Sequence, residues 1–405
     1  MNMKTEQKKM KGPMEGVRIL DFTHVISGPF STMLLADMGA EVIKIEKPGE
    51  GEFYRAEGTK NEAGVSIVYP NYNRNKKGIT LNIKSSKAVE LLKKMVAKAD
   101  VFVENQRPGL LASIGLGYED LKAINPKIIY ASISGFGQDG PYARKPAFDM
   151  TIAAISGLMS VNGIEGTVPT KTGAAFSDFI SGIYAALGIV AALRKRDKTG
   201  EGSYVDVGMF DSILSVLDDF IPKYKVTGKE PTRFGNRRAG FAPVNVFPVK
   251  NGEYVYIAGS FQKQWEALAS LIGREELITD PRFKDNTGRK QHEALLESIV
   301  EEWSLTKTSQ DAVIELEKAG IPCAPVKGIG DLFKDEHIQA RNSIIECDYP
   351  GIGKYAMAAN PIRISNYQQP VERAPMLGEH NESILNELLG YTADDIVLLK
   401  REGVI

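Results

Sequence analysis

The sequence predicts an α/β protein built on a doubly wound parallel sheet, with a second, smaller α+β domain. Strand and helix patterns alternate through the first 135 residues, as expected when each parallel strand is followed by a crossover helix. A hairpin pattern then appears at residues 245–259, where Asn251-Gly252 marks a tight turn between two alternating runs. The length of 405 residues and the apolar content of 43% allow two or three domains with ordinary cores.

Five short apolar or β-branched runs provide the predicted strands of the sheet, at residues 17–22, 41–46, 78–83, 101–105 and 127–134. Helical patterns lie between them, for example at 30–38 and 87–98. Gly39 suits the left-handed position after the first of these helices, and Ser85 or Ser86 can cap the second. In such sheets a ligand lies beyond the carboxyl ends of the strands.

The loops expected at that edge of the sheet are rich in Lys and Arg. Four of them follow strands, at 23–29, 46–49, 105–109 and 135–145. A fifth, 73–77, precedes a strand and reaches the same edge only if the segment before it folds back. Four of the five carry a basic residue, which predicts a polyanionic ligand, although Lys and Arg are also common in surface loops.

One phosphate-binding motif matches the sequence but lacks its context. Residues 135–140, GFGQDG, fit G-x-G-x-x-G and follow a predicted strand. Pro141 and Tyr142 come next instead of a long apolar helix, and no acidic residue ends a second strand about 20 residues later, as a dinucleotide site requires. We therefore do not predict NAD binding, and no Walker A sequence is present to hold a triphosphate.

One carboxylate, Asp178, directly precedes the fifteen uncharged residues 179–193. As a helix this run is about 22 Å long, which is too short to cross a bilayer, so we expect it inside a large domain. At the start of such a helix an aspartate is either an ordinary N-cap or a half-buried nucleophile beside free amide groups. The residues alone leave both interpretations open.

Composition excludes several classes of function. Fifty basic and 51 acidic residues leave a net charge of −1, which argues against nucleic acid and anionic membranes as partners. The basic segment 1–16 leads into no apolar stretch, so we expect no signal peptide, no anchor and a cytoplasmic setting. Cys323 and Cys347 form no C-x-x-C pair and the four His form no H-x-x-x-H pair, so we expect no disulfide framework and no metal.

The second half of the chain changes in character. Helical patterns at 149–160 and 174–196 precede 203–224, which indicates a short strand and an apolar helix. Residues 226–243 are rich in Gly, Pro and Arg and predict a linker into the smaller domain. A last helix after Thr392 has an apolar face that needs a partner surface.

Seven segments in this order resemble the class III coenzyme A transferases, the family of formyl-CoA transferase and the CaiB/BaiF proteins. They are LDFTHVISGPFSTMLLADMGAEVIKIEKP, NYNRNKKGITLNIKS, ADVFVENQRPG, SISGFGQDGPY, the Asp178 helix with RKRDKTGEGSYVDVGMFDS, FGNRRAGFAPVNVFP and PMLGEHNESIL. The resemblance implies an interlocked homodimer. It also implies a Rossmann-like CoA-binding domain of residues 12–205 and 335–405, a linker helix at 206–224 and a small domain at 225–334.

The resemblance further implies a reaction and a site. Coenzyme A would move from an acyl-CoA to a free carboxylic acid through anhydride and thioester intermediates on Asp178, with no cofactor beyond CoA itself and no metal. Such chemistry needs an unpaired carboxylate rather than a catalytic triad. The positions matching CoA contacts in the family are His24, Val25, Ile26, Lys47, Asn73, Lys76, Asn105, Gln106 and Lys145, and Arg107 is added as a further expected CoA contact.

Several residues depart from the family pattern. The oxalate-specific branch has a Gln where Ile26 stands and a run of glycines where residues 234–238 stand, so formate and oxalate are not expected as substrates. Ser113 replaces a common basic residue, whose contact Arg107 could supply. Related α-methylacyl-CoA racemases place a proton-transferring His where Phe148 stands, and Phe cannot move a proton. Racemase activity and a nonenzymatic CoA-binding role remain the alternatives to transfer.

Overall fold

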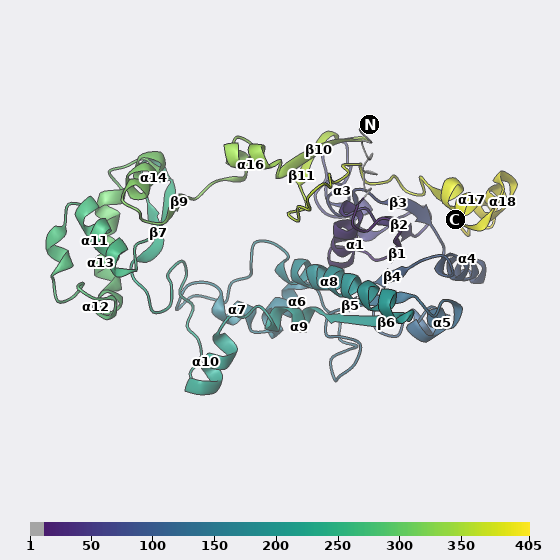
Figure 1. Cartoon of the computed structure of the whole chain (residues 1–405), viewed down its shortest axis with the longest axis horizontal. Helices are drawn as coiled ribbons and strands as arrows, with labels where there is room; N and C mark the ends of the chain where they lie inside the picture. Colours follow the sequence, from purple (N-terminus) through teal and green to yellow (C-terminus); the bar gives the residue numbers. More distant parts are fainter. Residues whose placement is uncertain (1–11) are drawn as a thin grey trace, which may run out of the picture. The chain divides into compact units, whose positions relative to one another are not determined.

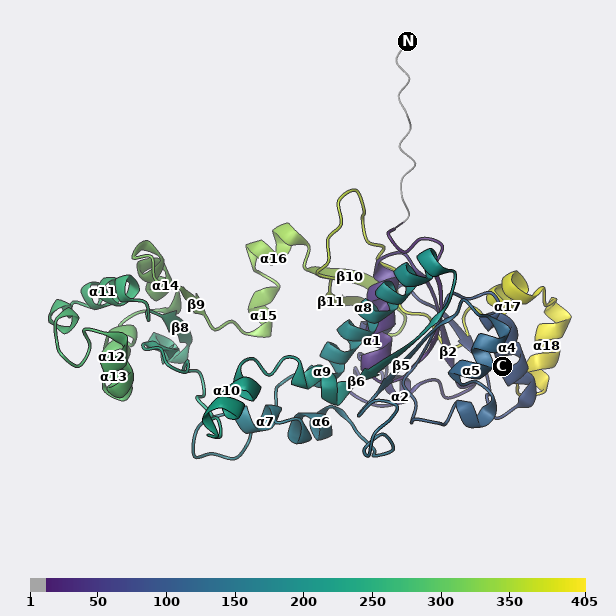
Figure 2. The same ribbon diagram turned by 60° about the horizontal axis from the view of Figure 1, so that its bottom comes forward.

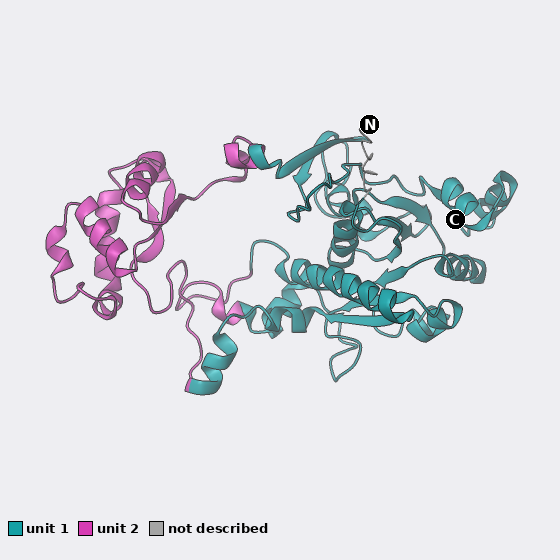
Figure 3. Ribbon diagram, viewed as in Figure 1, with its two compact units in different colours: residues 1–158, 172–226, 340–405 teal, residues 159–171, 227–339 magenta. Residues whose placement is uncertain are grey.

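The computed structural model describes residues 12–405, and the segment for which no signal peptide is expected lies largely outside that range. The chain forms two compact units (Figure 3). Unit 1 contains the described residues up to Leu158 together with Thr172–Val226 and Ala340–Ile405. Unit 2 contains Met159–Lys171 and Thr227–Gln339. The larger unit is therefore assembled from segments at both ends of the chain.

Unit 1 is organised around a six-stranded sheet in which every pair of neighbours is parallel. Its strands are β1 (Arg18–Phe22), β2 (Glu41–Glu46), β3 (Lys77–Thr80), β4 (Val101–Glu104), β5 (Ile129–Ser134) and β6 (Ser203–Gly208). The order β3-β2-β1-β4-β5-β6 places the reversal of winding between β1 and β4. This confirms the doubly wound sheet, and it predicts a ligand site at the carboxyl ends of these two strands.

Helices cover both faces of the sheet. On one face, α1 (Ser27–Asp37) and α8 (Phe176–Thr199) lie side by side, as Figures 1 and 2 both show. Buried residues of these two helices, among them Leu35 and Ile189, pack on strand residues such as Val103. The other face is covered by α4 (Ser86–Val96), α5 (Tyr118–Ile124), α17 (Asn381–Leu389) and α18 (Ala393–Arg401).

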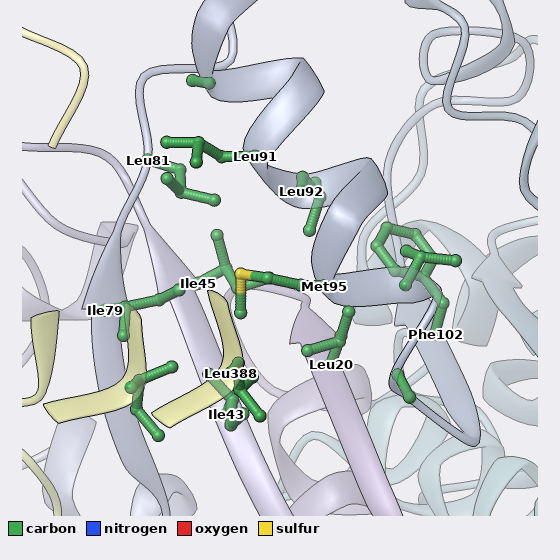
Figure 4. Packing of buried hydrophobic residues seen from close by; sticks show 14 of the residues in the cluster. Leu20, Ile43, Ile45, Ile79, Leu81, Leu91, Leu92, Met95, Phe102 and Leu388 are labelled. Atoms are coloured by element: carbon green, nitrogen blue, oxygen red, sulfur yellow. The ribbon is translucent and has the colours of Figure 1, made fainter. Parts of the chain in front are cut away.

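The C-terminal helices find their partner surface in this second core. Figure 4 shows Leu388 of α17, Ile43 of β2, Met95 of α4 and Leu20 of β1 packed in one hydrophobic cluster. Ile396 and Leu399 of α18 belong to the same cluster. The apolar face of the tail, which the sequence left without a partner, is therefore buried within the chain itself.

Helix α8 passes a length and composition test for a membrane span, but it is a core helix of unit 1. Its buried face contacts α1, β5 and β6. Gly182 permits the close approach of α1, since a Cβ there would lie 2.8 Å from the carbonyl oxygen of Ser27. The two helices therefore meet near their N-termini without a side chain between them.

The predicted linker helix at 206–224 is wrong in detail. Its first residues belong to β6, and the rest forms two separate helices, α9 (Met209–Leu214) and α10 (Phe220–Thr227). Asp218 between them adopts φ 51°, a left-handed conformation that a helix cannot contain. Smaller elements complete unit 1: α2 (Phe53–Ala56), α3 (Tyr69–Asn73), η1 (Ala112–Ile114), α6 (Asp149–Ile155), β10 (Ile344–Tyr349) and β11 (Gly353–Ala358). Helix α16 (Glu336–Arg341) lies where the chain returns from unit 2 to unit 1. Helix α7 (Leu158–Val161) lies where the chain passes from unit 1 to unit 2.

Unit 2 is an α+β unit with its own core around Trp265, Phe283 and Leu296. The predicted hairpin is confirmed, because β7 (Val244–Pro248) and β8 (Tyr254–Ala258) pair antiparallel. Asn251 and Gly252 between them both have positive φ. The unit also contains β9 (Cys323–Pro325), η2 (Lys250–Gly252), η3 (Glu275–Ile278), α11 (Gln262–Leu271), α12 (Asn286–Gln291), α13 (Glu293–Ser304), α14 (Ser309–Lys318) and α15 (Ile329–Leu332).

Candidate active site

Asp178 occupies the third position of α8 and is 9% exposed. The N-cap of this helix is Ala175, so Asp178 is not the N-cap that the sequence allowed as an alternative. The hydroxyl and the backbone amide of Ser27, the first residue of α1, instead lie near its carboxylate and favour the charged form. The N-terminal ends of two helices, both of which favour negative charge, therefore meet at this one side chain.

The environment of Asp178 disfavours its charged form. Burial is the largest cause and the nearby Asp149 carboxylate adds to it, whereas the hydroxyl and amide of Ser27 oppose it; the net effect raises the pKa of Asp178 to about 7. Asp149 begins α6 and accepts a hydrogen bond of 2.7 Å from the Ser177 amide. A carboxylate with little solvation and no cation to neutralise it is suited to nucleophilic attack.

The turn between β1 and α1 brings three predicted residues together with two from the loop after β4. The His24 backbone amide donates to the Asn105 side-chain oxygen at 2.9 Å, and the Asn105 side-chain nitrogen donates to the His24 carbonyl at 2.8 Å. Its ring Nδ1 lies 3.0 Å from the Gln106 side-chain nitrogen. Burial, assisted by Lys44, lowers the pKa of His24 to about 4, so its ring is neutral at physiological pH.

The other two residues of this turn are Val25 and Ile26. Ile26 is the N-cap of α1 and is buried. Val25 has φ 69°, a conformation that is rare for a β-branched residue. Its amide donates to a carboxylate oxygen of Glu52 at 2.9 Å.

A cavity of about 360 Å³ opens at the carboxyl ends of β1, β2 and β3. Its lining includes His24, Lys47, Glu52, Lys84 and Gln106. Lys47 carries a half-exposed ammonium group that pairs with Glu50 at 2.6 Å. The cavity therefore offers two lysines at the edge of the sheet where a phosphate-bearing ligand is expected.

Lys84 is a lining residue that the sequence interpretation missed. It follows β3 directly, in the segment Leu81 to Lys84 that forms one wall of the cavity. The rule that ligands bind beyond the carboxyl ends of parallel strands would have selected it. The predicted site instead contained the basic loop 73–77, which precedes β3.

The structure contradicts the predicted CoA contacts at Lys76 and Asn73. The Lys76 ammonium group is fully buried and donates to Asp21 at 2.9 Å, to the Pro29 carbonyl at 2.9 Å and to Asn73 at 2.8 Å. All three of its donors are thus used inside the protein, and Asn73 is itself buried by this contact. Neither side chain is available to a phosphate.

The last two predicted contacts lie in exposed loops. Arg107 follows Gln106 and is exposed, and so is Lys145, whose ammonium group lies 3.6 Å from the centre of the Tyr142 ring. Neither residue lines the 360 Å³ cavity.

Among residues 12–405 no group of three or more His, Cys, Asp or Glu side chains is arranged to hold a metal ion.

Comparisons with known proteins show which family the chain resembles over its length. A family model described as CoA-transferase family III matches residues 14–381. The chain is 36% identical over 394 residues to the succinyl-CoA–D-citramalate CoA-transferase of Chloroflexus aurantiacus, covering 97% of this chain and 98% of that one. It is also 36% identical to the human succinyl-CoA:glutarate CoA-transferase, covering 97% and 90%, and 38% identical to the acetyl-CoA:oxalate CoA-transferase of Acetobacter aceti, covering 95% and 97%.

A solved structure shows the same fold. The crystal structure of a CaiB/BaiF family protein from Brucella suis superposes with a TM-score of 0.85 at 35% identity. The match covers 93% of this chain and all of that one. The similarity therefore extends through both units and is not restricted to the parallel sheet.

Proposed function

Because the chain belongs to CoA-transferase family III and transfers CoA between acyl-CoA and carboxylates, we propose that Asp178 is its nucleophile. One observation supports this above the others: Asp178 is a buried carboxylate with no cationic partner, held by Ser27 where two helix N-termini meet. A residue with only a structural role would gain nothing from a pKa near 7. We also retain a cytoplasmic setting as part of this proposal.

The reaction conserves the activated acyl group at each step. The Asp178 carboxylate attacks the thioester carbonyl carbon, the carbon–sulfur bond breaks, and CoA leaves as a thiolate from an acyl–aspartyl anhydride. The thiolate then attacks the aspartyl carbonyl, which releases the donor acid as a carboxylate and leaves an aspartyl-CoA thioester. The acceptor carboxylate repeats these two steps in reverse order, so Asp178 is regenerated without a net proton transfer.

The structural surroundings of Asp178 favour transfer over racemisation. Racemisation requires a proton donor and acceptor on each side of the substrate α-carbon. At the position where related racemases carry a His, this chain has Phe148, the N-cap of α6, which is 71% exposed. The Asp178 carboxylate alone provides the nucleophile that transfer requires.

We propose that CoA occupies the cavity at the carboxyl ends of β1 to β3, with its phosphates near Lys47 and Lys84. Lys84→Ala is expected to weaken acyl-CoA binding by about 1–3 kcal/mol, because one charge-assisted contact is lost. Calorimetric titration with an acyl-CoA and with a phosphate-free acyl-pantetheine should show the loss for the first ligand alone. Lys87→Ala is the matched control, since Lys87 lies three residues on and pairs with Glu402; equal losses for both ligands would contradict the assignment.

The names of the relatives suggest which acids to test as acceptors. They include the acids glutarate, D-citramalate and oxalate and the CoA donors succinyl-CoA and acetyl-CoA. We propose that the enzyme accepts short carboxylic acids of this kind but prefers acids other than oxalate, because Ile26 offers no polar group beside the nucleophile. Incubating the enzyme with succinyl-CoA or acetyl-CoA and each acid, followed by mass spectrometry of the CoA esters, identifies the preferred pair.

We further propose that the enzyme is an interlocked homodimer. Helix α8 exposes Ile183, Leu187 and Val190, and a cavity of about 450 Å³ lies between it, β6 and α9. An apolar face of this kind on a core helix is typical of an interface between subunits.

An interlocked pair cannot separate while both subunits are folded. Sedimentation at nanomolar concentration should therefore give twice the chain mass of 44.4 kDa. Denaturant should remove the dimer and the helical signal in one transition whose midpoint rises with protein concentration. A folded monomer on dilution would contradict the interlocked arrangement but not the transfer chemistry.

A further inference from the structure

We propose that Glu52 is a positioning residue for the nucleophile: it holds the turn between β1 and α1 in the strained conformation that places Ser27 against Asp178. The inference rests on the proposed role of Asp178, and its test is chosen to be independent of that role. No direct contact between Glu52 and the reacting atoms is required.

The turn contains a conformation that must be held. Val25, at φ 69°, lies two residues before Ser27. A β-branched side chain in this region clashes with its own backbone, so the conformation persists only where the surroundings impose it. Strain of this kind is concentrated at functional sites, and here it lies between the end of β1 and Ser27, the residue whose hydroxyl and amide favour the charged form of Asp178.

Both ends of the turn are fixed by buried contacts. At its start, the Lys44 ammonium group donates to the Thr23 carbonyl, and Asp21 accepts the Thr23 amide at 3.0 Å. At its end, Lys76 donates to the Pro29 carbonyl at 2.9 Å. These contacts hold the positions that flank the turn. Inside the turn, the Asn105 side chain accepts the His24 amide at 2.9 Å and donates to the His24 carbonyl at 2.8 Å, so it holds the first half of the turn.

Glu52 provides the contact in the middle. One of its carboxylate oxygens accepts the Val25 amide at 2.9 Å, and its own amide donates to Glu46 at 3.0 Å. Glu46 is in turn fixed by Arg55, through bonds of 2.7 and 2.8 Å, and by Tyr69. The backbone of Glu52, whose carboxylate binds Val25, is therefore itself held by the Glu46–Arg55 ion pair.

Apart from the Val25 bond, the Glu52 side chain lines the cavity at the carboxyl ends of β1 to β3. It is 8% exposed, forms no ion pair, and its second oxygen is buried without a hydrogen-bond partner. Burial raises the pKa of this carboxyl group, against the opposing effects of Lys44 and the Val25 amide. Burying a carboxyl group for a single hydrogen bond is costly, which indicates that this bond matters for function.

The consequence for catalysis follows from the short distance between Val25 and Ser27 along the chain. If Val25 relaxed to an ordinary φ, the peptide groups after it would rotate, and the amide and hydroxyl of Ser27 would no longer point at Asp178. These two groups stabilise the carboxylate form of Asp178. The nucleophile would then be both misplaced and harder to ionise.

The first test compares Glu52→Ala and Glu52→Asp with Glu52→Gln. Glu52→Ala removes the carboxylate that accepts the Val25 amide, and Glu52→Asp shortens the side chain by one methylene so that its carboxylate no longer reaches that amide. We therefore expect kcat to fall about 10- to 100-fold in both variants. Gln keeps an oxygen at the same reach and should retain at least about a third of the wild-type kcat. Glu57→Ala is the control, since Glu57 is exposed on the same segment.

The pH profile separates positioning from simple electrostatics. Displacement of the Ser27 hydroxyl and amide from Asp178 should move the acid limb of kcat/KM to higher pH by about one unit in Glu52→Ala. Removal of a nearby negative charge alone would move it to lower pH. The other titratable groups that act on Asp178 are unchanged in these variants, namely Asp149 on α6, Tyr54 on α2 and Tyr72 on α3.

A rescue experiment tests the turn directly. Glycine adopts positive φ without a steric penalty, so adding Val25→Gly to Glu52→Ala should restore kcat at least about fivefold over Glu52→Ala alone. Wild-type kcat and an unshifted pH limb in Glu52→Ala, or no restoration by Val25→Gly, would overturn the inference. If Asp178→Ala instead kept its activity, the proposed nucleophile would be wrong whatever the Glu52 variants showed.

Discussion

Asp178→Ala is expected to lower kcat by at least about a thousandfold while leaving acyl-CoA binding intact, because a covalent nucleophile has no substitute in the site. The cavity proposed to bind CoA is lined by other residues, so we expect its affinity for the ligand not to depend on this carboxylate. Single-turnover transfer and calorimetric CoA titration of the same preparation would measure the two quantities. Residual activity above about 1% of wild type would contradict attack by Asp178.

Two further measurements bear on the same residue. Hydroxylamine added during turnover should convert an aspartyl intermediate to a hydroxamate, which peptide mass spectrometry would locate at Asp178.

The wild-type kcat/KM should rise with pH up to about pH 7 and then level off, because the pKa of Asp178 is raised to about 7 and only its carboxylate form attacks. Asp178→Asn is the isosteric control, since it preserves shape but cannot form the anhydride.

The second large effect concerns stability. Asp21→Ala is expected to lower the free energy of unfolding by about 3–5 kcal/mol, because it leaves two buried ammonium groups without their carboxylate. Asp21, Lys44 and Lys76 all have fully buried side chains, with Asp21 2.9 Å from Lys76 and 3.8 Å from Lys44. Burial alone would raise the pKa of Asp21, yet the two lysines and the Thr23 and Thr32 hydroxyls hold it well below its usual value.

The sign of the pH dependence follows from that lowered pKa. The stabilisation by Asp21 is present above its unfolded pKa of about 4 and is lost as the pH falls below it. Urea unfolding at pH 7 should therefore show the full difference from wild type, and the difference should narrow in acid. Asp139→Ala, in an exposed loop, is the control and should change stability by less than about 0.5 kcal/mol.

A compensating variant makes this result specific to charge. Asp21→Ala combined with Lys76→Met removes one of the unpaired ammonium groups and should recover part of the lost stability. A loss below about 1 kcal/mol for Asp21→Ala would show that the cluster does not stabilise the fold. No recovery in the double variant would show that the loss arises from packing instead of unpaired charge.

Much of the molecule could be predicted from local pattern. The five predicted strands each coincide with a strand of the sheet to within a few residues, because a buried parallel strand requires a continuous apolar run. The 250–252 turn was predictable because Asn and Gly tolerate positive φ. The candidate nucleophile was also visible, since an isolated acid beside fifteen uncharged residues is unusual in any sequence.

The roles of individual lysines could not be predicted in the same way. Lys76 and Lys84 both flank β3, and their residue type is the same. Lys84 lines the cavity, whereas Lys76 reaches inward to Asp21, more than fifty positions away along the chain. A lysine stem is long enough to point either way, so only the positions of the neighbouring carboxylates decide between a ligand contact and a buried ion pair.

The sequence by itself determined the fold class, the family and the residue proposed to carry the chemistry, because these depend on local periodicity and on motifs of contiguous residues. The tertiary structure alone decided how Asp178 is held. The groups that favour its charged form belong to Ser27, the turn before Ser27 is bound by Glu52, and these three residues are far apart in the sequence. Contacts between distant residues are set by how helices and strands pack, and no local propensity encodes them.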